Sequence, residues 1–554
     1  VVGDGKSTIQ ELIDIINADP RRGYGHEKVL TAIKVNDMTM NLIESAGYTL
    51  ETVLQEGENL NLKDTANLST GGTATDVTDI VHPENIFMAE RIARVVGLNI
   101  CGIDVMTSDI SKPLSVTNGA VLEVNAGPGF RMHLAPTEGL PRNVAGHVVD
   151  MLFPPGTTGR IPIVAVTGTN GKTTTTRLIA HMVKMMGYQV GYTTSDGIYI
   201  QNHMLDVGDC TGPASAEFVL KDPTVDFAVL ETARGGLLRA GLGFHFCDIA
   251  VVTNVAPDHL GLRGINTVEQ MARLKGVVPE TVLPDGYAIL NADDALVYDM
   301  RKNLNCNIAL FSMEEDNENI KRHAANNGIY ALYEDGFITV CRGNWKMRII
   351  KAVNVPLTYG GKARFMIQNV LPAVLTGYIR GFDLRDIKMA LESFIPSPSQ
   401  TPGRLNLFKF KDFQVLLDYA HNAAGMKALA HFIENLGGKP KVGIIAGIGD
   451  RRREDNEDMG RMAAEMFDEI IIRQDKNLRG KTEEELIEML QDGIKKADPN
   501  KPVKVIKREK DAITHAITNA KPGSLIVLCS DVVPEALKLV LEFKEQEAEK
   551  LYEL

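Results

Sequence analysis

The residues best suited to chemistry form one glycine-rich run: Gly168, Thr169, Asn170, Gly171, Lys172, Thr173 and Thr174. Apolar, β-branched residues 162–167 come directly before this run, and residues 173–186 have helical spacing. Between a strand and a helix, glycines let backbone N–H groups turn toward phosphate oxygens, and the helix N-terminus adds partial positive charge. Lys172 adds a full charge, and the hydroxyl of Thr173 can hold Mg²⁺. The run therefore predicts a site for ATP and Mg²⁺, although Val166 stands where the common GxxxxGK[ST] loop has its first glycine.

A carboxylate follows the next apolar run, because Glu231 comes directly after residues 227–230. In open α/β sheets, ligands collect at the carboxyl ends of the strands, and carboxylate oxygens suit Mg²⁺. Taken alone, a glutamate is usually a solvated surface charge. A lone histidine is likewise more often a core residue than a ligand. The interpretation therefore depends on the order in which several such residues follow the loop.

The sequence Thr-Gly-Thr-Asn-Gly-Lys-Thr-Thr resembles the phosphate loop of the Mur ligase superfamily, which includes peptidoglycan amino-acid ligases and folylpolyglutamate synthase. Residues that resemble the superfamily's later motifs follow in the same order: Glu231, His259, Lys275, Asn291, Asn369, Arg404, Asp418 and His421. The resemblance implies that Thr173, Glu231 and His259 hold Mg²⁺. It also implies that Lys275 is carbamylated and supports a second Mg²⁺, although only the spacing of this lysine favours that role.

The same resemblance implies roles around the nucleotide. Asn291 and Asn369 would contact it, Arg404 would approach its γ-phosphate, and Asp418 and His421 would line its cleft. The expected catalytic set is Lys172, Glu231, His259, Lys275 and Arg404. Residues 447–451 follow another apolar run, where they could recognise an incoming amino acid or form a solvated polar turn.

A second set of oxygen ligands lies nearer the start of the chain. Alternation in residues 121–125 places Glu123 and Asn125 on one face of a strand, and we expect Asp104 on a neighbouring strand. Such a set can bridge Mg²⁺ ions between ATP phosphates, and it resembles the Asp…Glu-x-Asn metal site of the ATP-grasp superfamily. A row of acidic residues on a strand edge is the alternative. The Gly/Ser/Thr-rich residues 67–74 add further donors for anions.

Two Pro/Gly-rich stretches, residues 153–162 and 395–403, divide the chain. We expect an α/β multidomain fold with three parts. Residues 1–152 are the C-terminal part of an ATP-grasp α+β domain. Residues 160–396 are a Mur ligase-like central ATP-binding domain, a P-loop parallel sheet covered on both faces, and residues 401–554 are a Rossmann-like C-terminal domain. Short apolar runs within 249–253, 414–417, 442–446, 469–472 and 525–528 supply further strands.

Composition excludes some classes of partner. The net charge is −12, and only residues 451–453 form a basic cluster, so no nucleic-acid partner is expected. The six cysteines are scattered, which favours a reducing, cytoplasmic compartment over a disulfide framework. No apolar run approaches the roughly 20 residues that span a bilayer, so no membrane association is expected. The chain starts Val1-Val2, which suggests a cut inside a longer protein.

An ATP-grasp segment upstream of a Mur-like ligase resembles the cyanophycin synthetase family, as do residues 451–455 and 471–480. The resemblance implies a homo-oligomeric ligase that acts on a cyanophycin or poly-aspartate primer. The ATP-grasp site would activate the backbone C-terminus for addition of L-aspartate. The Mur-like site would activate the new side-chain carboxylate as an acyl phosphate, which the α-amine of L-arginine attacks. The ATP-grasp unit of that family needs a preceding half, so we expect a deficient ATP-grasp site beside a nearly complete Mur-like site.

Three alternatives stay open. A related ligase polymerises β-Asp-Arg dipeptides with an inactive Mur-like half, but the intact Gly-Lys-Thr-Thr run, Glu231 and His259 speak against it. A peptidoglycan or folate ligase would leave residues 1–152 unexplained. A non-catalytic module that assembles subunits or holds polymer would show no affinity for Mg²⁺-ATP.

Overall fold

The computed structural model describes residues 1–552 except 25, 26, 29, 64–71, 475–477, 479 and 531. The chain divides into two compact units, Val1–Arg160 and Ile161–Leu554. Most of the predicted donor loop at residues 67–74 lies outside the described residues, as does part of the stretch 471–480. Within the described part of the chain, no helix has the length and apolar character needed to cross a membrane. None of the six cysteines forms a disulfide there.

The first unit consists of short elements. Its beginning holds α1 (Ile9–Asn17), β1 (Arg22–Gly23), β2 (Leu30–Thr31) and α2 (Asp37–Ser45) around a small apolar cluster. The rest contains η2 (Thr78–Ile80), α3 (Pro83–Val96), β3 (Gly102–Met106), α4 (Leu114–Thr117), β4 (Ala120–Asn125), α5 (Arg131–Leu134) and α6 (Val144–Leu152). Strands β3 and β4 pair antiparallel, and the only buried residue of α3 is Asn85.

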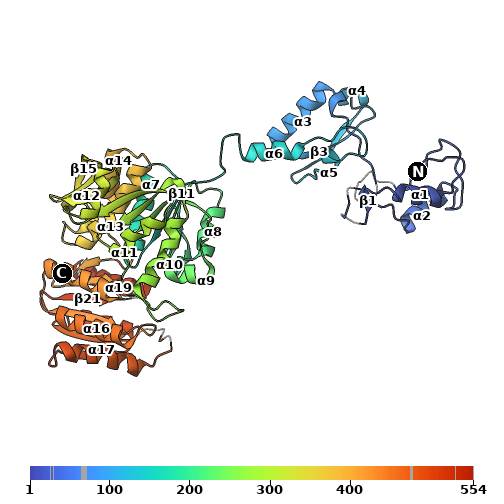
Figure 1. Cartoon of the computed structure of the whole chain (residues 1–554). Helices are drawn as coiled ribbons and strands as arrows, with labels where there is room; N and C mark the ends of the chain where they lie inside the picture. Colours follow the sequence, from blue (N-terminus) through green and yellow to red (C-terminus); the bar gives the residue numbers. More distant parts are fainter. Residues whose placement is uncertain are drawn as a thin grey trace. The chain divides into compact units, whose positions relative to one another are not determined.

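The second unit contains a central domain and a C-terminal domain (Figure 1). The central domain is built around an eleven-stranded sheet. Its strands lie in the order β15 (Trp345–Lys351), β14 (Phe337–Arg342), β13 (Ile329–Glu334), β12 (Asn307–Ser312), β11 (Val282–Asn291), β10 (Cys247–Val252), β5 (Ile163–Thr167), β9 (Phe227–Glu231), β6 (Val190–Thr194), β7 (Gly197–Ile200) and β8 (His203–Val207). The strands from β13 to β6 are parallel, whereas both edges are antiparallel meanders. The predicted parallel sheet is confirmed at the centre, and the antiparallel edges are an addition that the apolar runs did not reveal.

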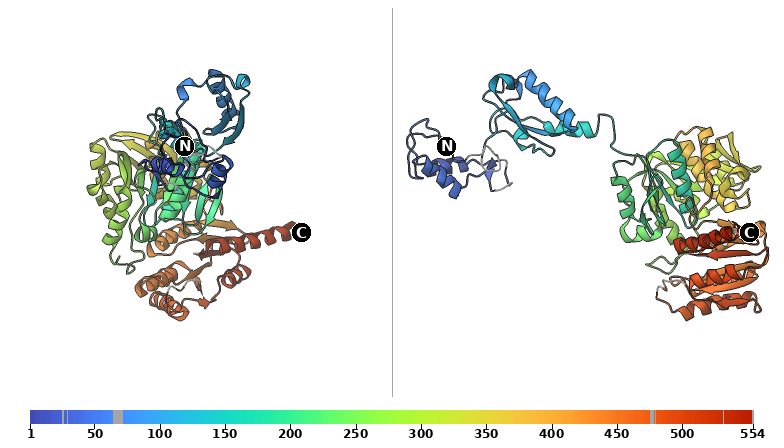
Figure 2. Two further views of the ribbon diagram at one scale, coloured as in Figure 1. Left: turned by 90° about the vertical axis from the view of Figure 1, so that its right-hand side faces the viewer. Right: turned by 180° about the vertical axis from the view of Figure 1, so that it is seen from behind.

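Helices cover both faces of this central sheet (Figure 2). Three of them pack on one face: α7 (Lys172–Met185), α13 (Arg364–Ile379) and α14 (Leu384–Ser393). The other face carries α8 (Pro213–Lys221), α9 (Arg234–Ala240), α10 (Val268–Glu280), α11 (Ala295–Asp299) and α12 (Glu318–Ala325). Strand β5 is therefore buried along its whole length, as its continuous run of apolar residues predicts.

The C-terminal domain begins near Arg404 and is built around a six-stranded sheet. Its strands lie in the order β16 (Asn406–Lys409), β17 (Gln414–Asp418), β21 (Leu525–Cys529), β18 (Lys441–Ala446), β19 (Glu469–Arg473) and β20 (Val503–Val505). All neighbours except β16 and β17 are parallel. One face packs against α15 (Ala423–Leu436), α16 (Arg453–Met466) and α17 (Glu483–Ala497), and the other against α18 (Glu509–Thr518) and α19 (Val533–Tyr552). The core of the first face is continuous with that of the central domain.

Candidate active site

The glycine-rich run forms a tight loop between β5 and the start of α7, as predicted. Gly168 has φ +146° and Gly171 has φ +86°, which are backbone conformations that favour glycine. A Cβ at Gly168 would lie 1.9 Å from Thr253 Oγ1, and one at Gly171 would lie 2.2 Å from Asn369 Oδ1. Both glycines are thus required by close packing as well as by backbone conformation.

Thr173, Glu231 and Ser195 meet beside this loop. The hydroxyls of Thr173 and Ser195 lie 3.1 Å apart, and the Ser195 N–H donates to Glu231 Oε2 at 3.1 Å. Glu231 is buried, and burial raises the pKa of its carboxyl group despite the opposing charge of Lys172. Of the described residues, none forms an ion pair with Glu231 within 4 Å. A buried carboxylate beside two hydroxyl oxygens is a donor set that fits Mg²⁺.

The turn that carries Ser195 also belongs to the site, although the sequence motifs did not predict it. Asp196 accepts hydrogen bonds from Thr194 Oγ1 at 2.9 Å and from Tyr199 Oη at 2.6 Å, and it pairs with the buried Arg177 of α7. Ser195 follows the carboxyl end of β6, at the same sheet edge as Glu231. The short β-branched run before Ser195 was the available signal, because ligands gather at that edge.

Arg404 reaches the same cluster from the start of the C-terminal domain. Its Nη2 lies 3.5 Å from Thr173 Oγ1 and 3.4 Å from Ser195 Oγ, and its guanidinium lies 4.3 Å from the ring centroid of Tyr419. Asp418 accepts a hydrogen bond from the Leu405 N–H at 2.9 Å. Burial raises the pKa of Asp418, which Arg404 partly offsets. Arg404 is therefore beside the predicted phosphate site, whereas Asp418 holds the backbone next to it.

Lys172 and Lys275 both hold carbonyl groups of the phosphate loop. Lys172 Nζ donates to Thr169 O at 2.9 Å, and Lys275 Nζ donates to Gly168 O at 2.7 Å. Lys275 is buried, and burial, reinforced by the charge of Lys172, lowers its pKa to about 7. The lowered pKa favours the uncharged amine of Lys275.

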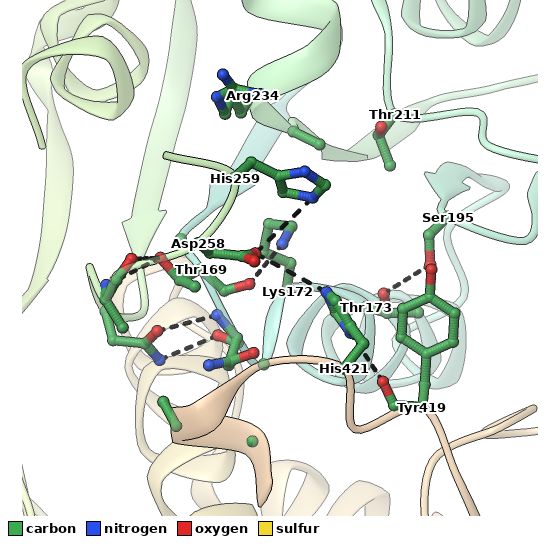
Figure 3. A pocket seen from close by; sticks show the side chains of 18 of the residues that line it. Thr169, Lys172, Thr173, Ser195, Thr211, Arg234, Asp258, His259, Tyr419 and His421 are labelled. Carbon is green, nitrogen blue, oxygen red and sulfur yellow. Dashed lines mark hydrogen bonds and ion pairs between the residues drawn. The ribbon is translucent and has the colours of Figure 1, made fainter. Parts of the chain in front are cut away.

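His259 lies in a cluster with Asp258 and His421 (Figure 3), whereas Glu231 contacts Ser195. One ligand atom from each of Asp258, His259 and His421 lies within 4.8 Å of the others, so the three could hold a metal ion. Arg451 Nη2 pairs with Asp258 Oδ1 at 2.7 Å, and His259 Nδ1 lies 3.1 Å from Asp450 Oδ2. Burial lowers the pKa of His259, which favours the neutral imidazole that binds metals. His259 also has a left-handed backbone, with φ +52°.

Of the remaining residues predicted to contact the nucleotide, Asn170 and Asn369 line the cavity and Asn291 does not. Asn170 and Asn422 exchange hydrogen bonds of 3.3 and 3.0 Å across the central and C-terminal domains, and Asn369 lies against Gly171. The Asn291 side chain donates to Thr253 O at 2.8 Å and so supports the end of β10.

The phosphate loop and most of the predicted site residues line one cavity of about 870 Å³. The loop 168–174, Glu231, His259, Lys275, Asn369, Arg404, Asp418 and His421 all contribute to it. Cations and loop amides at one end suit a polyphosphate, and Asp258, His259 and His421 could bind a second cation. Such a cavity can activate a carboxylate by phosphoryl transfer.

Residues 166–377 match the Mur ligase middle domain, and residues 403–532 match the Mur ligase glutamate ligase domain. The unit formed by residues 161–554 belongs to the Mur ligase family. This Mur ligase unit is similar in fold to E. coli FolC in complex with DHPP and ADP. That match has a TM-score of 0.51 and 19% identity, and it covers 69% of this chain and 89% of that one.

The similarity to cyanophycin synthetases extends beyond the Mur ligase unit. The chain is 51% identical to the cyanophycin synthetase of Crocosphaera subtropica over 540 residues, which cover 98% of this chain and 62% of the relative. It is also 33% identical over 153 residues to the glutathione biosynthesis bifunctional protein of Clostridium perfringens, covering 28% of this chain and 20% of that protein. The chain thus spans about three fifths of the length of the cyanophycin synthetases that it matches.

In the first unit, β3 and β4 hold the second predicted metal set. Asp104 is paired with Glu123 in the antiparallel register, which confirms that they lie on neighbouring strands. Asn125 Nδ2 donates to Glu123 Oε1 at 3.1 Å. All three side chains are exposed, so their oxygens are accessible but not enclosed.

Proposed function

We propose that this chain is an ATP-dependent ligase of cyanophycin synthesis. Its Mur ligase unit activates an aspartate side-chain carboxylate, to which the α-amine of L-arginine is joined. The observation that carries the proposal is the 51% identity to cyanophycin synthetases over nearly the whole chain. The phosphate loop, Glu231 and Arg404 around one cavity support the same chemistry.

The reaction needs an acyl phosphate because a carboxylate is a poor electrophile. A carboxylate oxygen attacks the γ-phosphorus of ATP, and ADP leaves. The amine then attacks the acyl carbon, loses a proton, and phosphate leaves as the amide forms. Lys172 and Arg404 neutralise charge on the transferred phosphoryl group.

The proposal includes two metal sites in the Mur ligase unit. Thr173 and Glu231 would hold Mg²⁺, with His259 contributing to a cation on the side of Asp258 and His421. The Mg²⁺ ion at Thr173 and Glu231 would stabilise negative charge on the phosphate oxygens. Lys275 fits carbamylation, because the neutral amine is the form that reacts with CO₂.

The first unit would supply part of an ATP-grasp site that extends the polymer backbone with L-aspartate. Asp104, Glu123 and Asn125 would bind its Mg²⁺, as their exposure and pairing allow. The longer relatives carry further residues that would complete this site. The substrates are a cyanophycin or poly-aspartate primer, L-aspartate and L-arginine, and we expect a cytoplasmic homo-oligomer without a nucleic-acid partner.

The test is ADP release by the purified chain with each amino acid and either a poly-aspartate or a β-Asp-Arg dipeptide primer. We expect release with arginine and poly-aspartate, and little aspartate-dependent extension. Release with dipeptide primers alone would favour the dipeptide ligase. Absence of Mg²⁺-ATP binding would favour a non-catalytic module.

A further inference from the structure

Leu405 directly follows Arg404, and side chains form hydrogen bonds with both its N–H and its carbonyl oxygen. Its N–H donates to Asp418 Oδ2 at 2.9 Å, and its carbonyl oxygen accepts a hydrogen bond from the hydroxyl of Tyr359. Leu405 is fully buried, and its φ is +51°. The backbone that carries Arg404 into the phosphate site is therefore fixed by one side chain of its own domain and one from the central domain.

Tyr359 joins the two domains by its ring as well as its hydroxyl. It lies directly after η5 (Pro356–Thr358) in the central domain, and its ring packs edge-on against Phe432 of α15 at 5.3 Å. The turn under Tyr359 is fixed by the Thr358 hydroxyl, which donates to Ala352 O and accepts from the Gly361 N–H at 3.0 Å. The backbone of Tyr359 is thus fixed by its turn, and its ring and hydroxyl are fixed by their contacts in the C-terminal domain.

Both partners of this hydrogen bond have left-handed backbones, since Tyr359 also has φ +51°. For a residue other than glycine, that conformation costs on the order of 1 kcal/mol or more. Such strain persists only where the surroundings determine it, and it gathers at functional sites. Two strained residues are hydrogen-bonded to each other, and one of them, Leu405, directly follows Arg404. This indicates a constraint on the position of that arginine.

We propose that Tyr359 is a positioning residue, which sets the Arg404 guanidinium beside Thr173 and Ser195 by holding the Leu405 carbonyl. The inference rests on the proposed function, because Arg404 is assigned there to the transferred phosphoryl group. Arg404 Nη2 lies only 3.4–3.5 Å from the two hydroxyls, so a small displacement of Leu405 removes these contacts.

The main test is the Tyr359→Phe variant, which keeps the ring against Phe432 and removes only the hydroxyl. Loss of one such hydrogen bond should lower kcat for arginine-dependent ADP release about 3- to 10-fold. The KM for ATP should stay within about twofold, because the phosphate loop is untouched. Tyr330→Phe is the matched control: the Tyr330 hydroxyl also donates to a backbone carbonyl, Gly343 O at 2.9 Å, but lies in β13 away from Arg404.

A double-mutant cycle separates positioning from general stability. Arg404→Lys keeps a cation but loses the planar fork, so Tyr359→Phe should cost less than about twofold in that background. An equal loss of kcat in both backgrounds, or the same loss in Tyr330→Phe, would overturn the proposal.

Hydrogen exchange tests the contact without any substrate. Tyr359→Phe should speed exchange in the peptide that contains the Leu405 amide, and Tyr330→Phe should not. Unchanged exchange in that peptide would contradict the positioning role. If wild-type protein releases no ADP with arginine and poly-aspartate, the proposed function fails, while faster exchange at Leu405 would still support the contact.

Discussion

At the scale of single residues, two lysines hold neighbouring carbonyl groups of the phosphate loop. Lys172 Nζ donates to Thr169 O and Lys275 Nζ donates to Gly168 O, and both lysines line the cavity. The pKa of Lys275 is lowered by burial. In the proposed function the two side chains differ: Lys172 would supply positive charge, and Lys275 an amine that gives up its proton more readily.

Replacing Lys172 by alanine should nearly abolish activity. In the proposed function the variant would lack the cation that neutralises the transferred phosphoryl group, so kcat should fall on the order of 100-fold or more. Arginine-dependent ADP release measures the effect. Lys184→Ala is the control, because Lys184 lies in the last turn of the same helix α7. Activity retained in Lys172→Ala would show that the assigned site is wrong.

The lowered pKa of Lys275 predicts a pH dependence of stability. Between about pH 7 and 10.5, the ordinary pKa of a lysine, the unfolded chain keeps a proton that the folded chain has lost. The free energy of unfolding should therefore rise with pH in this window, by at most about 1.4 kcal/mol per pH unit. Urea unfolding at pH 7, 8 and 9 should show a steeper rise for wild type than for Lys275→Met. Parallel slopes would contradict the assignment.

At the scale of elements, the loop between β5 and α7 depends on its contact with α13. An added methyl group at Gly171 would collide with Asn369 Oδ1 at 2.2 Å. Gly171→Ala should therefore displace the loop and weaken Mg²⁺-ATP binding about tenfold, since overpacking typically costs 1–3 kcal/mol. Calorimetric titration measures this affinity.

Gly187→Ala is a matched control for that variant. Its φ of +88° nearly equals the +86° of Gly171, but a Cβ there meets nothing within 4 Å. Both substitutions carry the cost of a left-handed alanine, and only Gly171→Ala adds the collision. Equal effects of the two variants on ATP affinity would show that the contact with Asn369 is unimportant.

The sequence predicts these elements where local signals are strong. The β-branched run of β5, the glycines after it and the acidic end of β9 specify a strand, a phosphate loop and Glu231 without reference to distant residues. Contacts between distant segments leave no such local pattern. Tyr359 and Leu405 lie 46 residues apart, and Asn170 and Asn422 lie 252 apart. The approach of His421 to the neighbouring residues Asp258 and His259 likewise depends on how the two sheets are packed.

At the scale of the whole molecule, the two units differ in how much apolar surface they bury. The second unit has a continuous core through both of its sheets. Among the described residues between 72 and 160, none belongs to a cluster of buried apolar side chains. Phe87 and Val95 of α3 are 66% and 77% exposed. Helices normally gain their stability from packing of an apolar face, so α3 has little to hold it in place.

This difference predicts that residues 161–554 fold and bind nucleotide without the first unit. Produced alone, they should unfold at the same temperature as the corresponding transition of the whole chain, and their Mg²⁺-ATP affinity should change less than about twofold. Residues 1–160 produced alone should bind an apolar dye such as ANS, because large apolar side chains are exposed. Scanning calorimetry and dye fluorescence measure the two properties. A lower transition temperature for residues 161–554 alone would instead mean that the first unit stabilises the Mur ligase unit.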